Sequence, residues 1–96
     1  MNTQDILTRI RELKPQMRTR YKAKEISLFG SFVRGEQSTN SDIDFLVEFE
    51  EGADLFDLMG LALLLEEQLQ RKVDVVPKSA LRPELRESVL QEVVAL

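Results

Sequence analysis

Hydrophobic residues in the N-terminal part of the chain recur at the spacing of a helix. Between residues 3 and 20 they fall three or four positions apart, at Ile6, Ile10, Leu13 and Met17. This spacing predicts an amphipathic helix, because residues three and four positions apart share one face. Thr3 is suited to cap its first turn, and Pro15 is placed to kink or divide it.

Three shorter stretches, rich in β-branched and aromatic residues, have the character of strands. They span residues 25–29, 43–49 and 72–76. A short helical turn is expected between the first two, at residues 31–36, followed by a polar loop at residues 37–41.

Two further helices are predicted after the second strand. Residues 54–70 have helically spaced apolar positions at Leu55, Leu58, Met59, Ala62, Leu65 and Leu69. The apolar run at residues 61–65 broadens that surface; it favours a place in the core and leaves some apolar surface for a partner. Pro83 suits the first turn of a last helix that runs to the C-terminus, with a stripe formed by Leu85, Val89, Leu90, Val93 and Val94.

The order of these elements, αβ(α)βαβα, predicts one domain across residues 1–96. We expect a two-layer α/β (α+β) fold in which three strands form a small mixed sheet, the helices pack on one face and the other face stays partly open for a ligand. A chain of 96 residues is large enough for one core but too small for a separate acceptor-binding domain. We therefore expect the acceptor of any transferred group to come from a partner.

Polar residues with candidate chemistry gather where two strands end and begin. Gly30 and Ser31 follow the first strand, where free backbone N–H groups and a hydroxyl can hold an anion. Asp42 and Asp44 stand at i and i+2 at the start of the second strand and so point to the same face, where they can share a divalent cation. Arg34 is a candidate contact for a phosphate, for a partner's carboxylate or for solvent alone. A Gly-Ser pair after a strand and two aspartates at i and i+2 are each common in segments that bind no ligand. Their combination favours a site for a nucleotide with its metal.

The chain resembles the nucleotidyltransferases of the DNA polymerase beta superfamily in two runs, Phe29-Gly30-Ser31 and Asp42-Ile43-Asp44-Phe45. The wider runs at residues 30–36 and 41–47 are most similar to its small stand-alone branch, the minimal nucleotidyltransferases or MNT proteins. The resemblance covers nearly the whole chain and implies the palm fold of that superfamily.

The resemblance also implies a role for individual residues. Members of the superfamily carry a third carboxylate on a later strand, and Asp74 supplies it here in the run Lys72-Val73-Asp74-Val75-Val76-Pro77. Asp42, Asp44 and Asp74 are then the catalytic residues, which bind one or two Mg²⁺ ions. The Gly-Ser pair after the first strand is then the site that holds the β and γ phosphates of ATP.

A function follows from the same resemblance. MNT proteins commonly act as antitoxins paired with HEPN-domain ribonuclease toxins, and active members transfer AMP from ATP to a tyrosine hydroxyl near the toxin's catalytic site. We therefore expect a Mg²⁺-dependent protein adenylyltransferase that forms a hetero-oligomer with a HEPN toxin encoded by the neighbouring gene. Two alternatives stay open: an antitoxin or adaptor that acts by occlusion alone, and the catalytic half of a small-molecule nucleotidyltransferase.

Composition narrows the chemistry further. The chain contains neither cysteine nor histidine, which excludes disulfides, thiolate or imidazole metal sites and phosphohistidine chemistry. Carboxylates are left as the natural catalytic groups, and a hard cation is their natural partner. The 13 basic and 17 acidic side chains give a net charge of −4, which argues against broad contact with nucleic acid. No leader pattern or membrane-length apolar run is present, so a cytoplasmic protein is expected.

Overall fold

The structure is a computed structural model that describes residues 3–29, 42–84, 87 and 94–95. Its elements follow in the order α1 (Thr3–Tyr21), β1 (Ala23–Phe29), β2 (Ile43–Phe49), α3 (Leu55–Leu69), β3 (Val73–Pro77), the 3-10 turn η1 (Lys78–Ala80) and β4 (Val94–Ala95). The strands form one sheet in the order β3-β2-β1-β4. β1 runs antiparallel to β2 and β4, and β2 runs parallel to β3, so the predicted mixed sheet is confirmed, with the short β4 as an additional edge strand.

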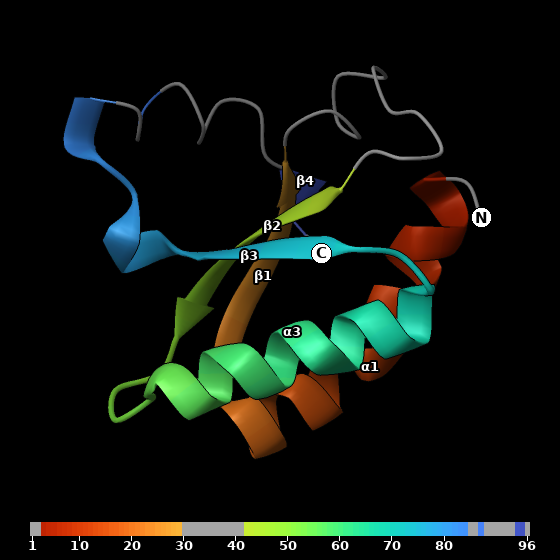
Figure 1. Ribbon diagram of the computed structural model, residues 1–96, viewed down its shortest axis with the longest axis horizontal. Coiled ribbons are helices and arrows are strands. Elements are labelled where there is room, and N and C mark those ends of the chain that lie inside the picture. Colours follow the sequence, from red (N-terminus) through yellow and green to blue (C-terminus); the bar gives the residue numbers. More distant parts are fainter. Residues whose placement is uncertain (1–2, 30–41, 85–86, 88–93, 96) are drawn as a thin grey trace.

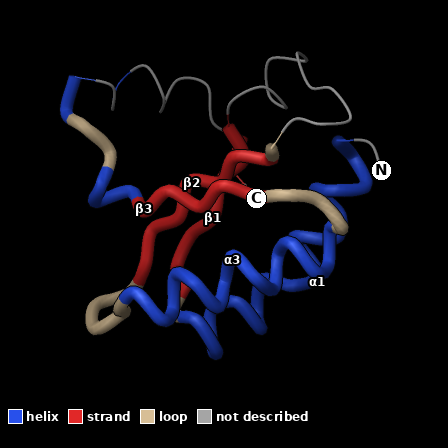
Figure 2. Tube along the Cα trace, in the orientation of Figure 1, coloured by secondary structure: helices blue, strands red, loops and turns tan. Residues whose placement is uncertain are grey.

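The two long helices that the structure describes lie on the same face of the sheet, as Figures 1 and 2 show. Because successive residues of a strand point to opposite faces, every second strand residue meets these helices. The buried cluster joins apolar residues of both layers: Ile6, Ile10, Leu13, Met17, Ala23, Ile26, Leu28, Ile43, Phe45, Val47, Leu61, Leu64, Leu65 and Leu69. The two-layer architecture with helices on one face is therefore confirmed. No helix within the described part of the chain is long and apolar enough to cross a membrane.

The opposite face of the sheet is only partly open. Leu46 lies on it, because its neighbours Phe45 and Val47 point into the helix-covered core, and yet Leu46 is only 4% exposed. The chain after β3 contacts β2 through η1, and Leu81, just beyond η1, is buried as well. This face therefore has a small apolar patch of its own beside its polar positions.

The first helix differs from its prediction in one respect. α1 continues through Pro15 to Tyr21 and is not divided there. Leu13 and Met17, on either side of the proline, are both buried, and their packing against the sheet holds the two halves in one helix. Pro15 itself is exposed, and its carbonyl oxygen accepts a hydrogen bond from the Thr19 hydroxyl at 2.9 Å.

The helix α3 turns a different side to the core than its spacing predicted. Leu55 and Met59, which the periodicity placed against the sheet, are 65% and 53% exposed, whereas Leu61 is fully buried. The expectation that the run at residues 61–65 belongs to the core holds for Leu61, Leu64 and Leu65. Because α3 is apolar on most of its circumference, spacing alone did not fix which side faces the sheet.

The start of α3 is fixed by its own acidic residues and by contact with α1. The Asp57 N–H donates to the Asp54 side chain at 3.1 Å, and the Asp54 N–H donates to the Asp57 carboxylate at 3.0 Å, which completes a capping box. One turn later, Gly60 faces Tyr21 of α1, and a Cβ at this position would lie 2.5 Å from the Tyr21 Cε1 atom. The absence of a side chain at Gly60 therefore lets the two helices approach.

The predicted C-terminal helix is wrong at its end. Pro83, Glu84 and Glu87 are helical, but Val94 and Ala95 form β4 and pair with Leu28 and Ser27 of β1. A β-branched residue suits a strand, and β1 would otherwise present an unpaired edge on this side, so a long-range pairing overrides the local periodicity. The rest of the predicted stripe (Leu85, Val89, Leu90 and Val93) and the predicted turn at residues 31–36 lie outside the described residues.

Candidate active site

One row of residues crosses the three main strands near one end of the sheet. The register aligns Phe29 of β1 with Asp44 of β2, and Asp44 with Asp74 of β3. Neighbouring strands lie about 4.8 Å apart, so the two aspartates are adjacent across the parallel pair. Asp74, which only the family resemblance had pointed to, is therefore brought beside Asp44.

Both carboxylates of this pair lie on the face away from the helices. Asp44 alternates with Ile43 and Phe45, which are fully buried in the helix-covered core. Asp74 alternates with Val73 and Val75, which pack against the same core. Asp44 is half-buried and Asp74 is exposed. The alternation of the strands thus presents two carboxylates side by side on the face opposite the helices.

Asp42 stands directly before β2 at the same end of the sheet and is exposed. The Ile43 N–H donates a hydrogen bond to the Lys72 carbonyl oxygen at 3.0 Å, which ties the start of β2 to the residue before β3. Asp42 lies one residue before Ile43, and Asp74 lies two residues after Lys72. The backbone therefore holds the predicted acidic residues at one corner of the molecule.

Two carboxylates stand directly opposite each other at this corner, because Asp44 and Asp74 are in register on neighbouring strands. Like charges in such positions disfavour strand pairing. A divalent cation bound between a nucleotide and these carboxylates would offset that repulsion.

The donor set fits magnesium better than a metal held by protein alone. Within residues 3–29, 42–84, 87 and 94–95, no group of three or more acidic side chains stands close enough to hold a metal ion. Magnesium, however, is usually bound through one or two carboxylates, and substrate phosphates and water complete its coordination. Since the chain has no histidine or cysteine, carboxylates are its natural metal ligands. The pair of Asp44 and Asp74 suits a hard cation that arrives with a nucleotide.

The predicted phosphate contacts Gly30, Ser31 and Arg34 lie outside the described residues, and their role stays a prediction. The structure does define where they are attached to the fold. β1 ends at Phe29, which is in register with Asp44, so Gly30 follows directly in sequence from the row of the two aspartates.

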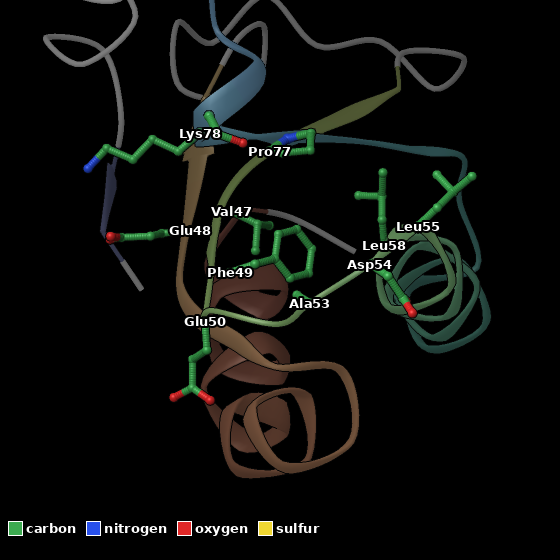
Figure 3. Close-up of a pocket in the computed structure, with 11 residues that line it drawn as sticks. Val47, Glu48, Phe49, Glu50, Ala53, Asp54, Leu55, Leu58, Pro77 and Lys78 are labelled. Carbon is green, nitrogen blue, oxygen red and sulfur yellow. The ribbon is translucent and has the colours of Figure 1, made fainter.

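A pocket that the sequence did not reveal lies at the opposite end of β2. It has a volume of about 710 Å³ and is lined by residues from the ends of β2 and β3 and the start of α3: Val47, Glu48, Phe49, Glu50, Ala53, Asp54, Leu55, Leu58, Pro77, Lys78 and Ser79. Figure 3 shows Val47 and Phe49 directed toward the first turn of α3, and Glu48 and Glu50 directed away from it. None of the predicted aspartates lines this pocket, so it is not part of the carboxylate site. In the sequence this region is marked only by the acidic residues Glu48, Glu50, Glu51 and Asp54.

Comparison with known proteins connects this fold and site to a family. The sequence model of the family described as nucleotidyltransferase domain matches residues 10–96, which include all three aspartates. The chain is 44% identical over 81 residues to the protein adenylyltransferase MntA of Thermococcus cleftensis, which covers 84% of this chain and 82% of that protein.

Solved structures related to this family have a similar fold. The structure of a candidate minimal nucleotidyltransferase superposes with a TM-score of 0.87 and 42% identity, over 100% of this chain and 97% of the other. A toxin–antitoxin structure with AMP-PNP superposes with a TM-score of 0.70 and 28% identity, over 88% of this chain and 69% of the other.

Proposed function

Because the chain belongs to the nucleotidyltransferase domain family, and is thus an enzyme of the nucleotidyltransferase type, we propose that it is a Mg²⁺-dependent protein adenylyltransferase. It transfers AMP from ATP to a hydroxyl, the side chain of a tyrosine, on a HEPN ribonuclease toxin encoded by the neighbouring gene. In this role it is the antitoxin of the pair and acts in the cytoplasm. The family itself is the one that the motif at residues 29–45 predicted, and that prediction is confirmed.

Different observations support the separate parts of this proposal. The relative at 44% identity is named a protein adenylyltransferase, which supports AMP as the transferred group and a protein as its acceptor. The related toxin–antitoxin structure contains AMP-PNP, an analogue of ATP, which supports ATP as the donor and a toxin as the partner. The observation that carries the proposed chemistry is the alignment of Asp44 with Asp74 on the face of the sheet away from the helices.

The proposed reaction is a single displacement at phosphorus. The acceptor oxygen forms a bond to the α-phosphorus of ATP, the bond from that phosphorus to the oxygen bridging the α and β phosphates breaks, and pyrophosphate leaves. The proton of the hydroxyl passes to a carboxylate. Bound magnesium supplies charge neutralisation on the triphosphate and polarises the phosphoryl group that is attacked.

The residues of the chain divide this work between them. Asp42 and Asp44 hold the metal–nucleotide complex from the start of β2. Asp74 lies on β3, which is the edge strand among the described residues, so an acceptor from another molecule can approach it. Asp74 would bind the ion nearest the acceptor and help take the hydroxyl proton. Gly30 and Ser31 bind the β and γ phosphates, as the family resemblance implies.

The acceptor is expected from a partner for a structural reason. Asp44 and Asp74 lie on the face of the sheet away from the helices, and Asp74 is exposed, which supports the approach of a hydroxyl from another molecule. That molecule would also exclude water from the site. In this proposal Arg34 contacts a phosphate or a carboxylate of that molecule.

The test is the intact mass of the toxin after incubation with this protein, ATP and magnesium. We expect the mass to rise in steps of one AMP, and we expect no rise with the Asp44→Asn variant when that variant still binds the toxin. A stable complex without any mass gain would contradict the proposal and favour inhibition by occlusion. Mass gain on hydroxylated small molecules, but not on the toxin, would assign the enzyme to the small-molecule class.

A further inference from the structure

A stripe of exposed apolar residues runs along α3 on the side away from the core. We define the α3 stripe as Leu55, Phe56, Met59 and Leu63, which fall on one side of the helix. Phe56 is 81% exposed and the other three are 53–65% exposed. Single exposed leucines are ordinary on a protein surface, but an aromatic residue beside three aliphatic ones forms a continuous patch, which marks interaction sites.

Folding does not account for this stripe. The opposite side of α3 already fills the core with Leu61, Leu65 and Leu69, all of them at most 2% exposed. Exposed positions on a helix of a single domain are normally polar, because an apolar side chain there gains nothing from folding. The stripe is therefore explained by something that covers it in an assembly.

The stripe continues into the pocket at the start of α3. Leu55 belongs to both, and the pocket wall beyond it is apolar at Val47, Phe49, Ala53 and Leu58 (Figure 3). A stripe along a helix that ends in a hollow suits an amphipathic helix, which lies along the stripe and places one large side chain in the hollow.

The charges around the stripe select the chemistry of the occupant. α3 contains the acidic residues Asp57, Glu66 and Glu67 and no basic residue. Asp57 is already engaged by Lys22 at 3.9 Å and by the capping box, so Glu66 and Glu67 supply the charge of the helix, and Lys78 is a basic residue of the pocket wall. Glu51 and Asp54, just before the helix, are exposed and add to the negative rim. An occupant with lysine or arginine beside its apolar residues is complementary to this rim, and charge complementarity favours fast and specific docking.

The same charges disfavour two other occupants. A second copy would bring an identical acidic rim against this one. Among the described residues, moreover, the stripe contains all the large exposed hydrophobic side chains, so a copy could dock only stripe against stripe, which sets the two acidic rims against each other. A membrane surface is disfavoured because helices that bind anionic lipid have basic polar faces.

We propose that the α3 stripe and its adjoining pocket are the docking surface for a basic amphipathic helix of the protein that bears the acceptor hydroxyl. This inference depends on the proposed function for one point only, namely that the partner is the toxin. α3 packs against β3, the strand that carries Asp74 (Figure 1), so a partner anchored on α3 can reach around the edge of the sheet to the carboxylates on its other face.

The first test measures binding without chemistry. The dissociation constant of the purified toxin is determined by calorimetry in the absence of ATP and magnesium, for the natural protein and for the double variant Phe56→Ser, Met59→Ser. We expect the variant to fold normally, since both residues are exposed, and to bind about thirtyfold more weakly or worse. The charge reversals Glu51→Lys and Glu67→Lys should also weaken binding, whereas the matched reversal Arg11→Glu on the exposed side of α1 should not.

A second test locates the contact directly. A photoreactive phenylalanine at position 56 should crosslink to a helix of the toxin that has basic residues next to apolar ones. An unchanged dissociation constant, a crosslink to a different kind of segment, or a homodimer that the double variant dissociates would overturn the inference. Because binding is measured without nucleotide, its failure differs from failure of the proposed function, which would leave binding intact and abolish the mass gain.

Discussion

Phe45 and Asp44 are neighbours on β2, and they face opposite environments. Phe45 is fully buried under the helices, in register with Leu28 and Val75. Asp44 lies on the other face, in register with Asp74. The apolar row and the acidic row are adjacent rows of one sheet, so a change of one residue along the chain crosses from the core to the candidate catalytic surface.

A residue that stabilises the core and a candidate catalytic residue are therefore adjacent in this sequence, and they can still be changed separately. The helix-covered face is apolar in β1, β2 and β3 and supplies the core. The other face carries Asp44 and Asp74 near the end of β1, and the buried Leu46 lies further along β2. Substitutions in these two rows should therefore move different measurements.

The largest effect is expected from Asp44→Asn. Loss of one carboxylate charge from the metal site should lower the rate of AMP transfer by about a thousandfold or more, since metal-assisted charge stabilisation contributes several kcal/mol. The melting temperature should change little, because Asp44 is half-buried and is not part of the apolar core. Mass spectrometry of the toxin and thermal melting check the two parts, and a large fall in melting temperature would break the comparison.

The neighbouring substitution Phe45→Ala should show the reverse pattern. Removing a fully buried aromatic side chain is expected to cost about 3–5 kcal/mol of unfolding free energy, which is a large part of the stability of a domain of this size. Urea denaturation followed by circular dichroism measures it. If the stability of Phe45→Ala equalled that of Asp44→Asn, the two faces would not differ as described.

A third substitution, Leu46→Ala, tests how much the face away from the helices contributes to stability. Leu46 shares this face with Asp44 but is 4% exposed, so its truncation should cost about 2 kcal/mol, less than Phe45→Ala. The same urea titration compares the two variants directly. A loss near zero would indicate that this face contributes nothing to stability.

The smallest effect is expected from Gly60→Ala, which sharpens the description of the helix layer. In an open helix this change stabilises by about 1 kcal/mol, but here the new Cβ would lie 2.5 Å from the Tyr21 ring, so we expect a net loss of about 1–2 kcal/mol. The double variant Gly60→Ala, Tyr21→Ala serves as the control. Adding the glycine substitution to Tyr21→Ala should be neutral or stabilising, and a further loss there would show that Tyr21 is not the obstacle.

The strands were predictable from sequence because their signal is local. The bounds of β2, residues 43–49, coincide with the prediction, and those of β1 and β3 differ by at most two residues. β-branched and aromatic runs bounded by polar residues determine strands over a few positions. The alternation within β2 also predicted that Ile43 and Phe45 point into the core, and the structure confirms this.

Features that depend on distant parts of the chain were not predictable in the same way. The pairing of Val94 and Ala95 with β1 joins segments that are far apart in sequence, and local periodicity favoured a helix there. The orientation of α3 left Leu55 and Met59 in solvent because the helix is apolar on most sides. The pocket exists only through the way α3 starts beside the ends of β2 and β3. For Asp74 the sequence predicted a strand adjacent to that of Asp44, and the parallel register that sets the two residues directly opposite each other came from the structure.

The position of Asp74 on an edge strand has a consequence for solubility. β4 covers one edge of the sheet, whereas in the described part of the chain no strand pairs with the outer side of β3. Asp74 carries the charge in the run Val73-Asp74-Val75-Val76, whose other residues are β-branched, and charged residues on edge strands oppose pairing with other chains. Neutralising Asp74 therefore risks aggregation as well as loss of chemistry, which makes Asp44→Asn the cleaner inactive variant.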